Sequence, residues 1–139
     1  MNSAEYAAIE GNSSITGRDE DLLRQVPEDQ RPAGKPSKQA FLPSTKDGGL
    51  LSTRRAAMGE RQAYDDHVAG GWSTSGTWHV NVGHAIDLDL PCIDDAAHVG
   101  VPHHASVSFL DHESRGQREQ RARKLARASR CLYEPPAEQ

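Results

Sequence analysis

The sequence predicts an α+β domain: a small mixed or antiparallel sheet of about 3–5 strands with two helices packed on it, the last one basic. Residues 77–82 and 104–109 alternate apolar and polar side chains, which is the period of a half-buried strand. Residues 114–131 instead repeat apolar side chains at helical spacing. No regular strand–helix–strand pattern occurs, so a doubly wound parallel sheet is not expected.

Composition limits the size of the core. The chain has 139 residues, of which 35% are hydrophobic and 26% are charged, so it has room for one domain. Residues 38–134, which hold most of the aromatic side chains, are expected to form it. Residues 1–37 are rich in Ser, Gly, Pro and acids and predict a largely disordered arm. Residues 135–139 predict a disordered tail.

A short docking segment is predicted within the arm. Residues 19–26 begin with acids and are followed by Pro27, as in two turns of helix. Leu22, Leu23 and Val26 would then form a small apolar patch. We expect this patch to bind the domain or a partner.

The elements of the domain follow in chain order. A Gly-Gly turn precedes the first strand, and a second Gly-Gly pair ends the first helix. Residues 85–90 fit either a strand or an irregular helical turn, because the hydrophobic period of so short a segment does not distinguish the two. The expected elements are a strand at 50–54, a helix at 57–69, strands at 77–82 and 104–109, and a helix at 114–131.

The last helix carries the strongest charge asymmetry. Residues 114–131 hold seven basic side chains against Glu119 alone, whereas the whole chain has a net charge of −4. This face fits a solvated surface, a docking surface for an acidic protein, or a nucleic-acid surface. The acidic remainder and the lack of aromatic residues beside the arginines disfavour the nucleic-acid surface relative to the other two. Arg118, Arg121 and Lys124 are the candidate contacts.

A polar group surrounds the first Gly-Gly turn. Backbone N–H groups of the turn, with the guanidinium groups of Arg54 and Arg55, can hold a phosphate or carboxylate. Asp47 and Ser52 lie beside them, and Ser52 would need a base such as His104 to act as a nucleophile. The alternative is an Asp-capped turn with surface arginines.

All seven histidines fall between positions 67 and 112, close to several acids. The sequence has no H-E-x-x-H, C-x-x-C or H-x-H spacing, so solvated or structural histidines are favoured over a metal site, and no metal ligand or cofactor is assigned. His104-Ala-Ser-Val107 fits the H-x-[ST]-hydrophobic element of two-histidine phosphoesterases. The second copy that this chemistry needs, His79-Val-Asn-Val82, has Asn in place of the hydroxyl.

Two cysteines and the lack of a long apolar run bear on location. Cys92 and Cys131 are too few for a disulfide framework. The chain has no apolar run of membrane-spanning length, and its first residues do not fit a secretory signal. We therefore expect a cytoplasmic protein with no membrane partner.

Several short segments along the chain form a recognisable pattern: Leu22-Leu-Arg-Gln-Val26, Gln39-Ala-Phe-x-Pro43, Asp47, Leu51-Ser52, Trp78 and Pro102-x-His104-Ala-x-Val-x-Phe109. In this pattern the chain resembles a group of small bacterial proteins of unassigned function. The resemblance implies a bacterial accessory gene but no activity, cofactor or site, and it places the 22–26 segment with the domain.

Two functions follow from these observations, and the sequence leaves open whether the protein is an enzyme. The first is a bacterial accessory or binding module that works within a larger protein assembly through the basic C-terminal helix and the N-terminal arm. The alternative is a small hydrolase or transferase on RNA, a nucleotide or another phosphate-bearing substrate. Its site would use Asp47, Ser52, Arg54 and His104.

Overall fold

The computed structural model describes residues 1–136, and its central feature is one antiparallel sheet in the order β1-β5-β6-β3-β2-β4-β7. Every neighbouring pair of strands is antiparallel. The strands are β1 (Ser13–Ser14), β2 (Asp21–Gln25), β3 (Leu50–Arg54), β4 (Thr77–Asn81), β5 (Cys92–Asp94), β6 (His104–Ser108) and β7 (Cys131–Tyr133). The α+β class with an antiparallel sheet is confirmed, but the expected 3–5 strands are too few.

Five α-helices flank this sheet in the described residues, rather than the two expected. The predicted helices correspond to α2 and α5, and the three others have four to six residues, too few for a helical period to be read. The α-helices are α1 (Ser3–Ala7), α2 (Glu60–Ala69), α3 (Val82–Asp87), α4 (Ala96–Val99) and α5 (Arg115–Ala128). Short 3-10 helices lie at η1 (Glu28–Gln30), η2 (Pro32–Gly34), η3 (Lys38–Phe41), η4 (Thr45–Asp47) and η5 (Ala56–Met58).

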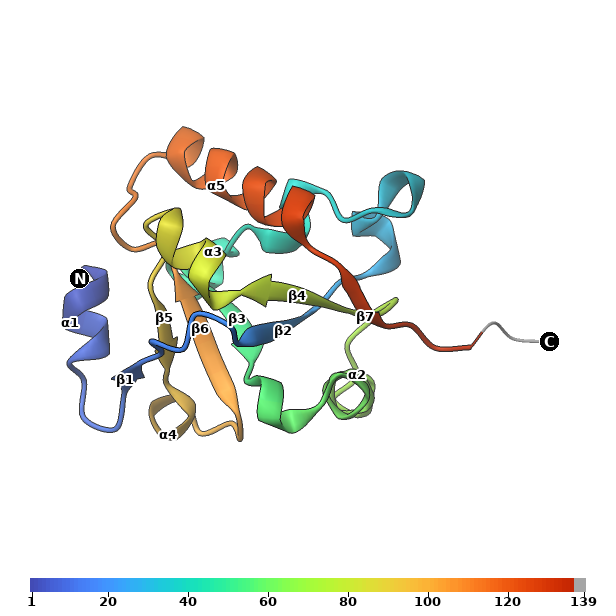
Figure 1. The fold of residues 1–139 in the computed structure, drawn as a ribbon, viewed down its shortest axis with the longest axis horizontal. Coiled ribbons are helices and arrows are strands. Elements are labelled where there is room, and N and C mark those ends of the chain that lie inside the picture. The colour runs from blue at the N-terminus through green and yellow to red at the C-terminus, as the bar shows by residue number, and fades with distance from the viewer. Residues whose placement is uncertain (137–139) are drawn as a thin grey trace.

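The helices lie on both faces of the sheet. Figure 1 shows α3 and α5 over one face and α2 and α4 against the other. The main core lies under α5, where Leu22, Leu51, Val80 and Val107 from four neighbouring strands pack with Leu125 of the helix. Burial of these side chains is the dominant stabilising contribution to the fold.

The opposite face of the same strands is polar. Ser52 of β3 pairs with Ser106 of β6, and Arg54 pairs with His104. Directly paired residues point to the same side of an antiparallel sheet. Alternation therefore gives one apolar face for the core and one polar face that α2 and α4 cover in part.

The segment expected to form a helical docking arm is β2, an interior strand of the sheet that lies between β3 and β4. Leu22 pairs with Val80 and Leu23 with His79, so the two leucines point to opposite faces of β2. Both are buried. A strand covered on both faces shows consecutive apolar residues rather than alternation, which explains why residues 19–26 look helical in the sequence. The helix prediction is wrong.

The rest of the expected arm also has structure. Residues 1–37 contain α1, β1 and β2, and Tyr6 and Ile15 are buried. The expected tail, 135–139, falls largely on residues 137–139, which lie outside the described part of the chain. None of the helices within residues 1–136 has both the length and the apolar character needed to cross a membrane.

The basic helix forms where it is predicted. Ser114 and Gln117 make a capping box at the N-terminus of α5, which satisfies two backbone N–H groups that the helix leaves open. Ala122, Leu125 and Ala126 form its buried stripe. The helix ends before residue 131, however, because β7 begins there and pairs with β4.

Candidate active site

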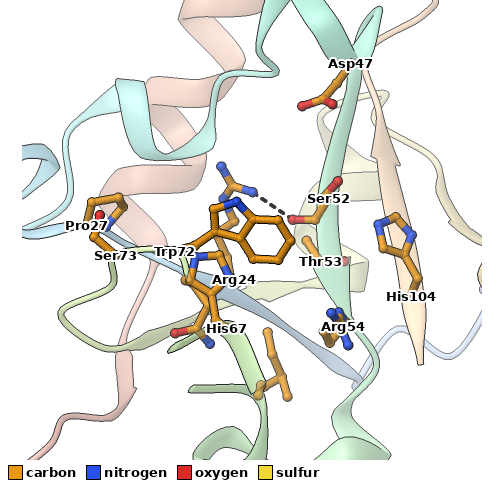
Figure 2. A pocket seen from close by; sticks show the side chains of 13 residues that line it. Arg24, Pro27, Asp47, Ser52, Thr53, Arg54, His67, Trp72, Ser73 and His104 are labelled. Carbon is orange, nitrogen blue, oxygen red and sulfur yellow. Dashed lines mark hydrogen bonds between the residues drawn. The ribbon is translucent and has the colours of Figure 1, made fainter. Parts of the chain in front are cut away.

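A cavity of about 500 Å³ opens on the polar face of the sheet, against α2. This volume lies within the roughly 300–1,000 Å³ range of small-molecule sites. Figure 2 shows its side chains converging from β2, β3, β6 and the α2 region. Its functional groups come from Arg24, Asp47, Ser52, Arg54, His67, Trp72 and His104.

Arg24 enters the cavity because β2 and β3 separate. The two strands pair only at Leu23 and Arg54. Beyond this pair the Arg24 guanidinium fills the gap, where Nε donates to the Ala40 carbonyl at 2.8 Å and Nη1 to the Ser52 carbonyl at 2.9 Å. A charged side chain thus replaces the strand-to-strand hydrogen bonds.

The charge of Arg24 has little compensation. Burial lowers the pKa of Arg24 to about 10, and the negative charge of Asp47 opposes this shift. Arg24 still carries its proton at neutral pH. Within residues 1–136, none of the ion pairs includes Arg24. A partly buried guanidinium without a carboxylate partner favours an anionic ligand.

Arg54 supplies the second guanidinium of the cavity. Its Nη2 lies 3.1 Å from Oδ2 of Asp66 on α2, and its Nη1 donates to the Pro102 carbonyl at 3.2 Å. These contacts fix the side chain beside His104, its direct partner across β3 and β6. Arg54 is therefore oriented but partly neutralised.

His104 is held by a buried carboxylate. Its Nδ1 lies 2.6 Å from Oδ1 of Asp95, a residue with no exposed surface. An ionised carboxylate can only accept, so Nδ1 carries the proton and Nε2 is the unprotonated nitrogen of the neutral imidazole. His104 also lines the cavity. The pair thus resembles the histidine–carboxylate arrangement that orients a general base.

Two hydroxyl groups hold Asp95 in place. The Tyr6 hydroxyl donates to Oδ2 at 2.5 Å and the Ser106 hydroxyl at 2.6 Å. Burial would raise the pKa of Asp95, but the hydrogen bonds from His104, Ser106 and Tyr6 together lower it below its usual range. Asp95 therefore stays ionised and keeps the proton of His104 on Nδ1.

Ser52 and Asp47 reach the cavity from β3 and η4. Ser52 pairs with Ser106, so it is a diagonal neighbour of His104, and such pairs lie about 7–8 Å apart. A bound molecule can therefore contact both side chains at once. Asp47 accepts a hydrogen bond from Ser44 at 2.7 Å, as an Asp-capped turn would. The four residues grouped from the sequence all line this cavity.

Arg55, the other predicted phosphate ligand, lies outside the cavity. Its Nη2 lies 2.7 Å from Glu20 and its Nη1 lies 2.8 Å from Asp94. The pairing to Glu20 is the largest of the effects that raise its pKa. Arg55 thus joins the segment before β2 to the last residue of β5, and both of its charged contacts are intramolecular.

The predicted partner-binding residues have mixed positions. Leu22, Leu23 and Val26 are buried and present no surface to a partner. On α5, Arg118 donates to the His112 carbonyl and Arg121 to the Leu88 carbonyl. Lys124 is exposed.

The histidines do not form a cluster. Within residues 1–136, no group of three or more His, Cys, Asp or Glu side chains is placed to hold a metal ion. His79, which the two-histidine interpretation would need in the same cleft, does not line the cavity. Its Nδ1 instead accepts the Arg130 backbone N–H at 2.7 Å. The second histidine of the cavity is His67, whose pKa is lowered mainly by burial.

Sequence reasoning missed four members of this site. Asp95 lies in an acidic loop pair, and nothing in the sequence distinguishes the buried carboxylate from its neighbour. Arg24 was placed on a predicted helix, and His67 and Trp72 flank a Gly-Gly helix end. The packing of α2 and β2 on the sheet brings Arg24, His67 and Trp72 to one cavity, and Asp95 lies behind His104.

Compared with known protein families, curated proteins and solved structures, the chain gives no match.

Proposed function

We propose that this protein is a small hydrolase or transferase that acts on a phosphate-bearing substrate in the cavity beside His104. The observation that carries the proposal is the buried Asp95–His104 pair, whose imidazole lines a cavity that also contains the guanidinium groups of Arg24 and Arg54. A general base and two anion-binding groups are the parts that phosphoester chemistry needs.

Each group has a role that follows from its position. Arg24 and Arg54 would bind the phosphate oxygens and stabilise the charge that increases on them in the transition state. His104 Nε2 would accept the proton of a water molecule or an acceptor hydroxyl. Asp95 would hold the resulting imidazolium in place and stabilise its charge.

The reaction balances without a redox partner. In hydrolysis, a bond forms between the water oxygen and phosphorus while the bond from phosphorus to the leaving alcohol breaks. The water proton passes to His104 and then to the leaving oxygen, which departs as the alcohol. In transfer, a hydroxyl takes the place of water. Ser52 is the protein hydroxyl that lies diagonal to His104.

The test is turnover of a panel of phosphate monoesters and diesters by wild-type protein and by two matched variants. We expect His104→Asn to lower turnover at least about 100-fold, since a general base contributes roughly 10²–10⁴-fold. His103→Asn is the control, because His103 is exposed and does not line this cavity. Asn also tolerates the left-handed backbone at this position, where φ is +62°.

Two results would contradict the proposal. One is a wild-type protein that turns over none of the esters in the panel. The other is a His104→Asn variant that is as active as His103→Asn. A thermal melt of each variant separates lost chemistry from lost folding.

A second proposal concerns the outer face of α5. Arg123, Lys124 and Arg127 are exposed there and would attract an acidic protein partner, as expected of an accessory module. Pull-down from the native host with wild type and with an R123E/K124E/R127E variant tests it. Recovery of the same proteins by both would contradict it.

A further inference from the structure

We propose that the substrate is a nucleoside phosphate whose base stacks on the indole of Trp72 at the mouth of the cavity. The inference rests on the proposed function, because it concerns the same cavity and the same two guanidinium groups. It adds the chemical class of the group attached to the phosphate.

The first observation is the exposure of Trp72. Its side chain is 63% exposed although it lines the cavity. The other exposed large hydrophobic residues of the described chain are Met1, Val68 and Val99, none of them aromatic. An indole left in water forgoes the stabilisation that its burial would give the fold. A ligand that covers the ring during binding explains its position.

The second observation is that the backbone fixes where Trp72 lies. Helix α2 ends in a Schellman motif, in which the Gly71 N–H donates to the Val68 carbonyl and the Trp72 N–H to the His67 carbonyl. Gly71 has φ of +87°, a left-handed conformation that favours glycine. Trp72 is therefore attached to the end of a helix rather than to a free loop.

The third observation is that the ring is supported without being covered. A Cβ added at Gly70 would lie 2.8 Å from Cζ3 of the indole, so the ring rests closely against this glycine. The centroid of the His67 ring lies 5.4 Å from that of the indole, at an interplanar angle of 39°. Figure 2 shows His67 beside Trp72 at the cavity. A ring held in this way is organised for stacking before the ligand binds.

The combination of groups selects the ligand class. Arg24 and Arg54 favour a phosphate, and a supported, exposed indole favours a planar aromatic group. A nucleoside phosphate carries both on one sugar, whereas a sugar phosphate or a phosphorylated alcohol lacks the planar group. Stacking on an aromatic side chain contributes roughly 5- to 150-fold in affinity per base.

The experiment measures binding to the full chain by calorimetry. The probes are AMP, ribose 5-phosphate and the 5′-phosphorylated dinucleotide pApA. We expect AMP or pApA to bind about 10-fold more tightly than ribose 5-phosphate. Tighter binding of AMP would indicate a free nucleotide as the ligand, and tighter binding of pApA would indicate the end of a nucleic-acid strand. Trp72→Ala should remove this advantage, and Trp72→Phe should keep most of it. Val68→Ala, an exposed position on the same helix, is the control.

The outcomes separate the two proposals. If the three probes bind equally and Trp72→Ala changes nothing, the stacking inference is wrong. In that case, loss of all binding in an Arg24→Gln variant that still melts cooperatively would still support the proposed phosphate site. If none of the probes binds the wild-type protein, both the stacking inference and the proposed function are overturned.

Discussion

Replacing Tyr6 by Phe removes one oxygen atom and the hydrogen bond that it donates to Asp95 at 2.5 Å. The ring itself remains, packed edge-on against His98 with 5.9 Å between the ring centroids. Asp95 Oδ2 keeps its hydrogen bond from Ser106. The change therefore isolates one bond to a buried charge, and such bonds stabilise proteins by about 1.5–3 kcal/mol. We expect the free energy of unfolding to fall by that amount near pH 7.

The pH dependence of this loss is a second measurable quantity. Burial would raise the pKa of Asp95, but its three hydrogen bonds lower it overall, so the folded state releases this proton more readily than the unfolded chain, whose Asp has a pKa of about 3.9. The stabilisation is then present above about pH 4 and is lost as the pH falls through the lower, folded-state value. The difference between wild type and Tyr6→Phe should therefore shrink near pH 3.

Urea unfolding near pH 7 and near pH 3 measures both effects. The control is Tyr64→Phe, which removes the same oxygen from a half-buried ring packed on Tyr133. A Tyr6→Phe variant that loses no more stability than Tyr64→Phe near pH 7 would refute the reasoning. So would a loss that is the same at both pH values.

Three further changes test the packing of the sheet. Burial is the largest effect that lowers the pKa of His79, and a protonated Nδ1 cannot accept the Arg130 N–H, so the unfolded chain binds this proton at higher pH than the folded state. The free energy of unfolding should therefore fall as the pH drops below about 6.5, and His79→Asn should flatten that part of the pH profile measured by urea unfolding. Gly76→Ala places a Cβ 2.7 Å from the Tyr133 carbonyl oxygen and should cost about 1–3 kcal/mol in urea unfolding. Leu22→Ala empties a fully buried site and should cost about 2–5 kcal/mol by the same measurement.

Each of these changes has its own contrary result. An unaltered pH profile in His79→Asn would show that its protonation does not oppose folding. Gly17→Ala adds a Cβ in open space and is the control for Gly76→Ala, so equal losses would contradict the clash. Val68→Ala is the exposed control for Leu22→Ala, and equal losses there would mean that β2 does not contribute to the core.

The sequence predicted the parts of the fold that have a clear period. The alternation at 77–82 and 104–109 identifies β4 and β6, and the helical spacing at 114–131 identifies α5. Strand β2 was mistaken for a helix because Leu22 and Leu23 are buried on opposite faces, which removes the alternation. Strands β1, β5 and β7 have two or three residues, which is too short for any pattern.

The candidate site was predicted only as far as local sequence reaches. Ser52 and Arg54 lie on one side of a predicted strand, and their nearness to His104 follows from a register that sequence alone does not give. Arg24 enters the cavity only because β2 and β3 diverge. Asp95 holds His104 across a loop and accepts a hydrogen bond from the Tyr6 hydroxyl of the first helix. Contacts between separate elements, rather than local propensity, therefore determine the position of Arg24 and of the Asp95–His104 pair.

The interior position of β2, between β3 and β4, also affects how the chain folds. Leu22 finds its neighbour Val80 far along the chain, and Ser14 of β1 pairs with Ile93. In Figure 1 the blue strand β2 lies beside the yellow-green β4. During synthesis, β1 and β2 therefore emerge from the ribosome well before their partners β5 and β4, and the sheet assembles only when most of the chain has been made. Such non-local pairing favours folding in milliseconds to seconds rather than microseconds.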